Sequence, residues 1–213
     1  MKKALLLVIG FLTAGAFYSS AQYISVGPVA GFGDSWVSNM SGTAKFKASP
    51  YLGIGMVYAK DIHWGWGAEL GVSHEGYKAD MGVNTVAVNP VYLRVPLRAY
   101  YFFGPYGSAV RPKIYAGPSF GFKVDEVQYV NGNRMTNSDV IGNTYNMKSD
   151  MFNSFDVGLN AGVGVNVRLM RGTWLNTDLG YNLGFLDAVN DAANGNNKNQ
   201  NIRANVGLLF GMK

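Results

Sequence analysis

The 213-residue sequence has no cysteine and only two histidines, and only 15% of its residues are charged. Without cysteine the chain forms no disulfide framework and carries no lipoprotein anchor, and two histidines leave little material for a metal site. Long apolar runs are also scarce, since after residue 21 none is long enough for a transmembrane helix. We therefore expect no metal, no cofactor and no thiol chemistry.

The N-terminus has the features of a cleavable export signal. Two lysines precede an apolar run over residues 4–17, and Ser19 and Ala21 occupy the small-residue positions of a signal-peptidase site. The pattern predicts a signal peptide over residues 1–21 and a single mature domain over 22–213. Removing two of 18 basic residues leaves 16 against 13 acidic ones, a scattered excess too weak to indicate a nucleic-acid partner.

Residues 155–169 alternate strictly between apolar and polar side chains, from Phe155, Val157 and Leu159 on one phase to Asp156 and Asn160 on the other. Period two indicates a strand with one apolar and one polar face. Strands of soluble sheets are usually about 5 to 6 residues long, whereas a membrane-crossing strand needs roughly 9 to 11. This segment is therefore long enough to cross a bilayer.

The same alternation recurs along the mature chain. Eight segments show it: Tyr23–Asp34, Tyr51–Lys60, His63–Ser73, Val91–Phe103, Pro112–Val124, Phe155–Leu169, Thr173–Phe185 and Ile202–Met212. A local bulge is expected at Pro96, because proline cannot donate to a strand ladder. Short turns alternate with long polar connections, which are Ser35–Ala48, His74–Val86, Asp125–Asp150 and Leu186–Gln200. The plan is that of an all-β, eight-stranded, antiparallel up-and-down transmembrane β-barrel.

The polar phase is expected to face inward, whereas a soluble barrel of the lipocalin kind would put the apolar phase inside. Arginine facing lipid at the bilayer midplane costs about 2 to 4 kcal/mol, so the charged positions belong in the lumen. They are Glu69, Arg94, Arg98, Lys113, Asp156, Arg168, Asp178 and Arg203. We expect them to form a salt-bridged plug, with a narrow anion-preferring passage as the alternative. Aromatic residues near strand ends predict interfacial girdles: Trp64, Trp66, Tyr101, Phe103, Trp174 and Phe185.

Other candidate sites are weaker. Ser73, His74 and Glu75 have the residue types of a catalytic triad, but neighbours on a strand point to opposite faces, so no catalytic residue is expected. Glycine pairs such as Gly162 and Gly164 lack the lysine and helix of a phosphate loop and are interpreted as lumen spacers. The asparagine-rich segment 194–201 is interpreted as a mobile loop, with ligand or cation capture as the alternative.

Three segments carry a family resemblance. V-Y-L-R-V-P-L-R-A-Y-Y-F at residues 91–102 resembles the Y-L-E-I-P-L-L-L-K-Y signature of the PorT-like outer-membrane β-barrel family of Bacteroidota. K-I-Y-A-G-P-S-F-G-F at 113–122 and F-D-V-G-L-N-A-G-V-G-V at 155–165 are similar to the strands that follow it. Arg94 stands where the family usually has an acid, and Phe210 takes the place of its terminal aromatic. The resemblance implies an accessory role in protein secretion.

Together these features predict a non-enzymatic protein of the cell outer membrane, with a plugged lumen and long loops that serve interaction or envelope structure. A small-solute channel of the porin kind and a lipid-modifying outer-membrane enzyme are the alternatives. The expected partners are outer-membrane lipid, lipopolysaccharide and a protein bound through the extracellular loops, and the barrel is expected to be a monomer.

Overall fold

The computed structural model describes residues 24–40, 42–59, 61–105, 107–135, 151–189 and 196–212. The expected signal peptide and its cleavage site lie outside these residues. No described helix is long and apolar enough to span a membrane. The strands join in one antiparallel sheet: β1 (Ile24–Val37), β2 (Thr43–Lys45), β3 (Tyr51–Ala59), β4 (Trp64–His74), β5 (Tyr77–Met81), β6 (Asn84–Phe102), β7 (Val110–Val130), β8 (Asn133–Arg134), β9 (Phe155–Met170), β10 (Thr173–Asp187) and β11 (Lys198–Gly211).

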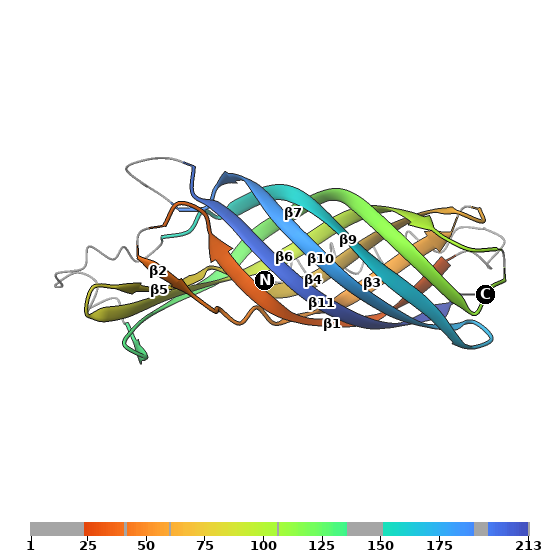
Figure 1. Ribbon diagram of the computed structural model, residues 1–213, viewed down its shortest axis with the longest axis horizontal. Coiled ribbons are helices and arrows are strands. Elements are labelled where there is room, and N and C mark those ends of the chain that lie inside the picture. The colour runs from red at the N-terminus through yellow and green to blue at the C-terminus, as the bar shows by residue number, and fades with distance from the viewer. Residues whose placement is uncertain are drawn as a thin grey trace, which may run out of the picture.

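Eight of these strands close into a ring. Neighbours follow the order β6-β4-β3-β1-β11-β10-β9-β7, and β7 pairs with β6 to complete it. β1 and β11 pair from Ser25 opposite Gly211 to Val37 opposite Asn199, so the first and last strands of the ring lie side by side (Figure 1). The predicted eight-stranded antiparallel barrel is confirmed.

The two ends of the barrel differ. Short turns join β3 to β4, β6 to β7 and β9 to β10 at the end where the C-terminus lies, on the right of Figure 1. The opposite end carries β2, β5 and β8, which extend beyond the ring. We call these the short-turn end and the long-loop end.

The wall of the barrel has an apolar outside and a polar inside. In β9 the odd-numbered Phe155, Leu159 and Val163 are exposed, whereas the even-numbered Asp156 and Asn160 are buried. In a water-soluble protein the apolar side chains would face inward, because moving apolar surface out of water lowers the free energy by about 25 cal/mol per Å². The exposed apolar wall is the surface that a lipid bilayer covers.

Outward aromatic residues gather at both ends of the wall. At the short-turn end the rings of Trp64 and Tyr101 meet edge to face with centroids 5.2 Å apart. At the long-loop end Phe122 and Phe155 lie 5.1 Å apart. The prediction that Trp174 belongs to an aromatic girdle is wrong. Even-numbered residues of β10 face inward, so the Trp174 ring lies in the mouth of the lumen.

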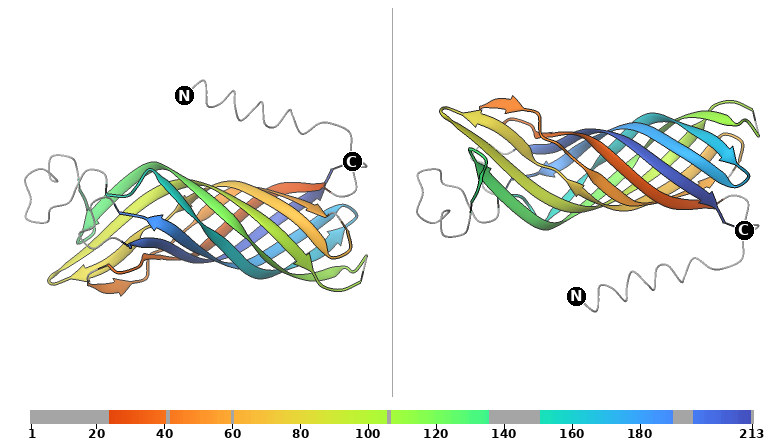
Figure 2. Two further views of the ribbon diagram at one scale, coloured as in Figure 1. Left: turned by 90° about the horizontal axis from the view of Figure 1, so that it is seen from above. Right: turned by 90° about the horizontal axis from the view of Figure 1, so that it is seen from below.

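β6 and β7 have 19 and 21 residues and continue past the ring at the long-loop end. β5 and β2 add to the outer edge of β6, and β8 adds to β7. The result is a five-stranded outer sheet, β2-β5-β6-β7-β8, which both views of Figure 2 show projecting from the barrel. The predicted connections at 35–48, 74–86 and 125–150 therefore contain strand. In β5 and the outer part of β7 the side chains alternate between buried and half-buried positions. Residues 136–150 and 190–195 lie outside the described ranges.

The bulge predicted at Pro96 is wrong. Arg94 opposite Gly71 and Leu97 opposite Ala68 keep one register across Pro96, because a proline removes a ladder hydrogen bond without adding a residue. The irregularity lies further out: Val91 opposes Asp125 but Tyr92 opposes Lys123, so β7 contains one extra residue, Val124.

The orientation of the wall makes a prediction at Val163, which is outward, 54% exposed and near the middle of β9. Val163→Arg should destabilise the barrel by about 2 to 4 kcal/mol, the cost of an arginine facing lipid at the midplane. Urea unfolding in lipid vesicles, followed by the shift between folded and unfolded gel bands, measures this cost. Val83→Arg, at a 97% exposed position beyond the ring, is the control; equal losses in both variants would contradict the orientation.

Candidate functional site

The polar lumen is the first candidate site. Seven of the eight ionic residues expected there are at most 6% exposed: Glu69, Arg94, Arg98, Lys113, Asp156, Asp178 and Arg203. The eighth, Arg168, is not buried in the lumen as predicted. It is exposed at the short-turn end, where its Nη2 donates to the Gly107 carbonyl at 3.0 Å and its guanidinium lies 5.9 Å from the Trp174 ring. Arg168 is the inward residue nearest that end of β9, so its long side chain reaches the mouth.

Arg94 and two carboxylates form the ionic layer nearest the long-loop end. Arg94 Nε and Nη2 donate to the two oxygens of Glu75 at 2.7 and 2.5 Å, and Nη2 also donates to Asp156 Oδ2 at 2.6 Å. Glu75 is fully buried, and it is absent from the predicted lumen residues because the predicted strand ends at Ser73. Continuing the alternation through His74 would have placed Glu75 inside.

Arg98 organises the second layer. Its Nη1 donates to Glu69 Oε1 and its Nε donates to Asn160 Oδ1 at 2.7 Å. Its guanidinium carbon lies 4.7 Å from the centre of the Tyr115 ring, and Tyr51 Oη donates to the second oxygen of Glu69 at 3.3 Å. Both charges of this ion pair are therefore hydrogen-bonded inside the barrel, as buried ions must be.

Lys113 forms the third layer, nearest the short-turn end. Its Nζ lies 2.8 Å from Asp178 Oδ1, donates to Asn176 Oδ1 and lies 5.0 Å from the centre of the Tyr100 ring. Asn176 also donates to Asp178 Oδ2 at 2.7 Å. The layer is a closed triangle of one ammonium, one carboxylate and one amide.

Arg203 is held differently, because no carboxylate of the described residues lies within ion-pair distance of it. Its Nη1 donates to Ser73 Oγ at 3.0 Å, its Nε donates to Asn205 Oδ1 at 2.9 Å, and its guanidinium carbon lies 4.1 Å above the Tyr51 ring. Among the described residues, the three ionic layers and Arg203 together contain four cations, Arg94, Arg98, Lys113 and Arg203, and four carboxylates, Glu69, Glu75, Asp156 and Asp178; Lys47 is a further buried cation.

Glycines make room where these large side chains cross the lumen. A Cβ at Gly121 would lie 2.7 Å from Arg94 Nη1, and a Cβ at Gly162 would lie 2.5 Å from Tyr115 Oη. A Cβ atom does not approach a nitrogen or an oxygen so closely, so a larger residue would push the opposing side chain away. This is the spacer role expected for Gly162.

A small apolar core lies at the long-loop end, and we call it the apolar cap. Phe152 is fully buried in it and stacks on Tyr77 with centroids 6.3 Å apart. The Glu126 carboxylate accepts the backbone N–H groups of Met151 and Phe152 at 2.9 Å each. Burial, and then the Glu126 charge, raise the pKa of Tyr77 to about 12. The buried members are Val37, Tyr77, Ala79, Val86, Val88, Val130, Phe152, Ala188 and Val189.

The apolar cap meets the first ionic layer directly. Tyr92, next but one to Arg94 on the inner face of β6, is fully buried and donates its hydroxyl to the Asn153 carbonyl at 3.0 Å. Asn153 follows Phe152 in the chain. The segment around Phe152 is thus tied to the lumen wall, and the Arg94 layer is shielded from solvent on this side.

The asparagine-rich segment is a second correction to the predicted loops. β11 begins at Lys198, so the last part of the expected connection 186–200 is strand, and Asn199 and Asn201 are buried in the lumen. Asn199 Nδ2 donates to Glu75 Oε2. Asparagine is common in turns, so the composition of this segment predicts a loop. Asparagine side chains can equally donate hydrogen bonds to buried carboxylates in a lumen. Residues 194 and 195 lie outside the described ranges.

The residue types of a triad do not converge. Ser73 and Glu75 point into the lumen, where they bind Arg203 and Arg94, while His74 is exposed on the outer face. Among the described residues no group of His, Asp and Glu side chains could hold a metal ion.

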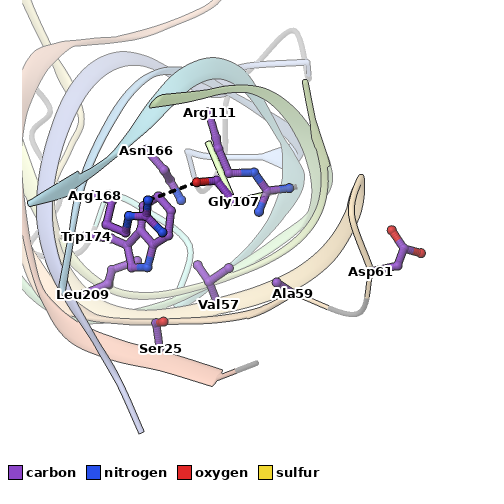
Figure 3. A pocket seen from close by; sticks show the side chains of 10 residues that line it. All are labelled: Ser25, Val57, Ala59, Asp61, Gly107, Arg111, Asn166, Arg168, Trp174 and Leu209. Carbon is purple, nitrogen blue, oxygen red and sulfur yellow. Dashed lines mark hydrogen bonds between the residues drawn. The ribbon is translucent and has the colours of Figure 1, made fainter. Parts of the chain in front are cut away.

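The mouth at the short-turn end contains a cavity of about 210 Å³. Arg168 and Trp174 lie together on one side of it, with Arg111 nearby and Val57 across the opening (Figure 3). The lining residues are Ser25, Val57, Ala59, Asp61, Gly107, Arg111, Asn166, Arg168, Trp174 and Leu209.

Residues 17–190 match the family model described as "Outer membrane protein beta-barrel domain". The chain belongs to this family. It is therefore an integral protein of the outer membrane, and β11, which closes the ring, lies beyond the matched residues. In proteins of this kind the short turns face the periplasm and the long loops face the exterior.

Solved structures with similar folds are distant in sequence. Neisserial surface protein A is 17% identical with a TM-score of 0.46, over 87% of this chain and 96% of that one. The attachment invasion locus protein Ail of Yersinia pestis is 12% identical with a TM-score of 0.47, over 89% and 99%. OprG of Pseudomonas aeruginosa is 15% identical with a TM-score of 0.45, over 89% and 94%. No curated protein matches the chain.

The paired charges predict a large effect of neutralising one of them. Glu69→Gln leaves the buried Arg98 guanidinium without its carboxylate, so the free energy of unfolding should fall by about 3 to 5 kcal/mol. The urea midpoint in detergent measures the loss. Adding Arg98→Met removes the stranded charge and should restore much of the stability. A Glu69→Gln protein as stable as the parent would contradict a structural role for the pair.

Proposed function

We propose that this outer-membrane protein is a non-enzymatic barrel with a closed lumen, which presents its outer sheet to a partner at the cell exterior. The observation that carries the proposal is the double closure of the long-loop end, by the Arg94 layer and by the apolar cap around Phe152.

The size and contents of the ring support a closed lumen. Eight strands enclose a space just wide enough for side chains to fill it. An ion crossing it would have to separate Arg98 from Glu69 and Lys113 from Asp178, and would then meet buried Phe152. This sequence of barriers favours a plug over the narrow anion-preferring passage.

Side-chain contacts join the strands of the outer sheet to one another. Lys45 Nζ lies 2.6 Å from Asp80 Oδ2, and Thr85 Oγ1 donates to Asp80 Oδ1 at 2.6 Å. The hydrogen bonds from Lys45 and then from Thr85 hold the pKa of Asp80 below its usual value. Val83, in the turn between β5 and β6, is 97% exposed. We propose a protein partner for this sheet, lipid and lipopolysaccharide around the wall, no nucleic-acid partner, and a monomeric barrel.

The PorT-like resemblance supports a more specific version of this role, in which the partner belongs to a protein-secretion apparatus. We also propose that the chain reaches the outer membrane by export and cleavage near Ala21, as residues 1–21 suggest. A lipid-modifying enzyme is the less favoured alternative, because Ser73 and Glu75 are engaged by lumen arginines and His74 points away from them.

A closed lumen predicts the absence of steady conductance. In planar bilayers the unmodified protein should show no stable openings, and Glu69→Gln at most brief flickers, because the other ionic layers and the apolar cap remain. Asp125→Asn, which removes a charge at an exposed position, controls for a general effect of neutralisation. Large, steady, anion-selective openings from the unmodified protein would replace this proposal with the channel.

The partner role is tested by a photo-reactive amino acid placed at Val83 in living cells. Protein adducts should form there, because the side chain projects from the outer sheet. Leu179, exposed on the outward phase of β10, is the matched position and should give lipid adducts only. Adducts at Val83 with secretion components would support the PorT-like version, whereas the same products at both positions would overturn the partner role.

A further inference from the structure

The mouth of the lumen at the short-turn end contains a cavity that has no part in closing the lumen. It is about 210 Å³ in volume, smaller than the roughly 300 to 1,000 Å³ of pockets for drug-sized ligands. Its size suits a molecule with a single ring. Because short turns face the periplasm, such a molecule would enter from the periplasmic side, opposite the outer sheet.

The cavity wall is cationic and flat on one side. Arg111 and Asn166 are register partners on β7 and β9, and Arg168 and Trp174 are register partners on β9 and β10. The Arg168 guanidinium and the indole ring of Trp174 therefore lie together on one side of the mouth, whereas the Arg111 guanidinium points away from them (Figure 3). Arginine forks match carboxylates, and an indole face suits an aromatic ring.

The polar groups of the cavity leave room for a ligand. Asp61, the acidic residue of the lining, accepts the backbone N–H groups of His63 and Trp64 at 2.8 and 2.6 Å, and in Figure 3 it lies well apart from Arg168. Asn166 is 7% exposed, and its Oδ1 has no hydrogen-bond partner among the described residues. A buried amide oxygen of this kind normally accepts a hydrogen bond.

We propose that this mouth cavity binds a small aromatic carboxylate from the periplasm. Arg168 holds the carboxylate, Trp174 stacks on the ring, and Asn166 accepts a hydrogen bond from a hydroxyl or N–H substituent. The apolar side chains of Val57 and Leu209 cover the rest of the ring. The site requires only the mouth, so it stands whether or not the lumen conducts.

The test uses 4-hydroxybenzoate as the probe and 4-hydroxybenzamide, its uncharged analogue, as the matched control ligand. Protein from the outer membrane is titrated in an uncharged maltoside detergent, and the indole N–H resonance of Trp174, assigned with Trp174→Phe, is followed by NMR. The acid should saturate the site and bind at least about tenfold more tightly than the amide, since a charge-assisted contact is worth a factor of about ten or more.

Two arginine variants distinguish binding in this cavity from a general effect of positive charge at this end of the barrel. Arg168→Gln should weaken binding of the acid by about tenfold. Arg171→Gln, an exposed turn arginine outside the lining, should change it less than about twofold, and gel migration before and after heating checks that both variants fold. Equal binding of acid and amide, equal effects of the two variants, inorganic phosphate binding as tightly as the probe, or no saturable shift would each overturn the proposal.

Discussion

Closure of the hydrogen-bonded ring between β1 and β11 is the constraint on which the rest of the structure depends. In lipid an unpaired backbone N–H or carbonyl costs several kcal/mol, so a sheet can cross only if it has no free edge. Closing after eight strands makes the lumen narrow. Inward side chains must then be either glycine or partners of one another, and the four cations and four carboxylates of the lumen meet that condition together with Tyr51, Tyr100 and Tyr115.

The ring and its charged interior could be predicted from the sequence because period two records the two faces of a strand directly. The alternation over Phe155–Leu169 gives β9 to within a residue. Arg94, Arg98 and Lys113 stand on the polar phase of long strands, and the cost of placing them in lipid leaves the interior as their site. The identity of each ion pair depends on strand tilt and register, which alternation does not encode.

The ends of the barrel could not be predicted in the same way. Glu75 and the asparagines of β11 occur in stretches whose composition is typical of loops, and only their contacts reveal that they line the lumen. Trp174 has the right residue type for a membrane interface but lies on the inward phase. Arg168 shares that phase, yet it is too close to the rim to join the buried charges. Pro96 shows that loss of one ladder bond does not force an extra residue.

Because of the extra residue Val124, different sets of residues face inward in the two parts of β7. Up to Lys123 the odd-numbered residues of β7 face inward, whereas beyond the bulge the even-numbered Gln128 and Val130 are buried. Without Val124, Gln128 and Val130 would turn outward with Glu126, and the backbone of Phe152 would lose its carboxylate acceptor. One inserted residue therefore lets the inner face of a single strand change from odd-numbered to even-numbered residues between the ionic lumen and the segment beside the apolar cap, with no break in the chain.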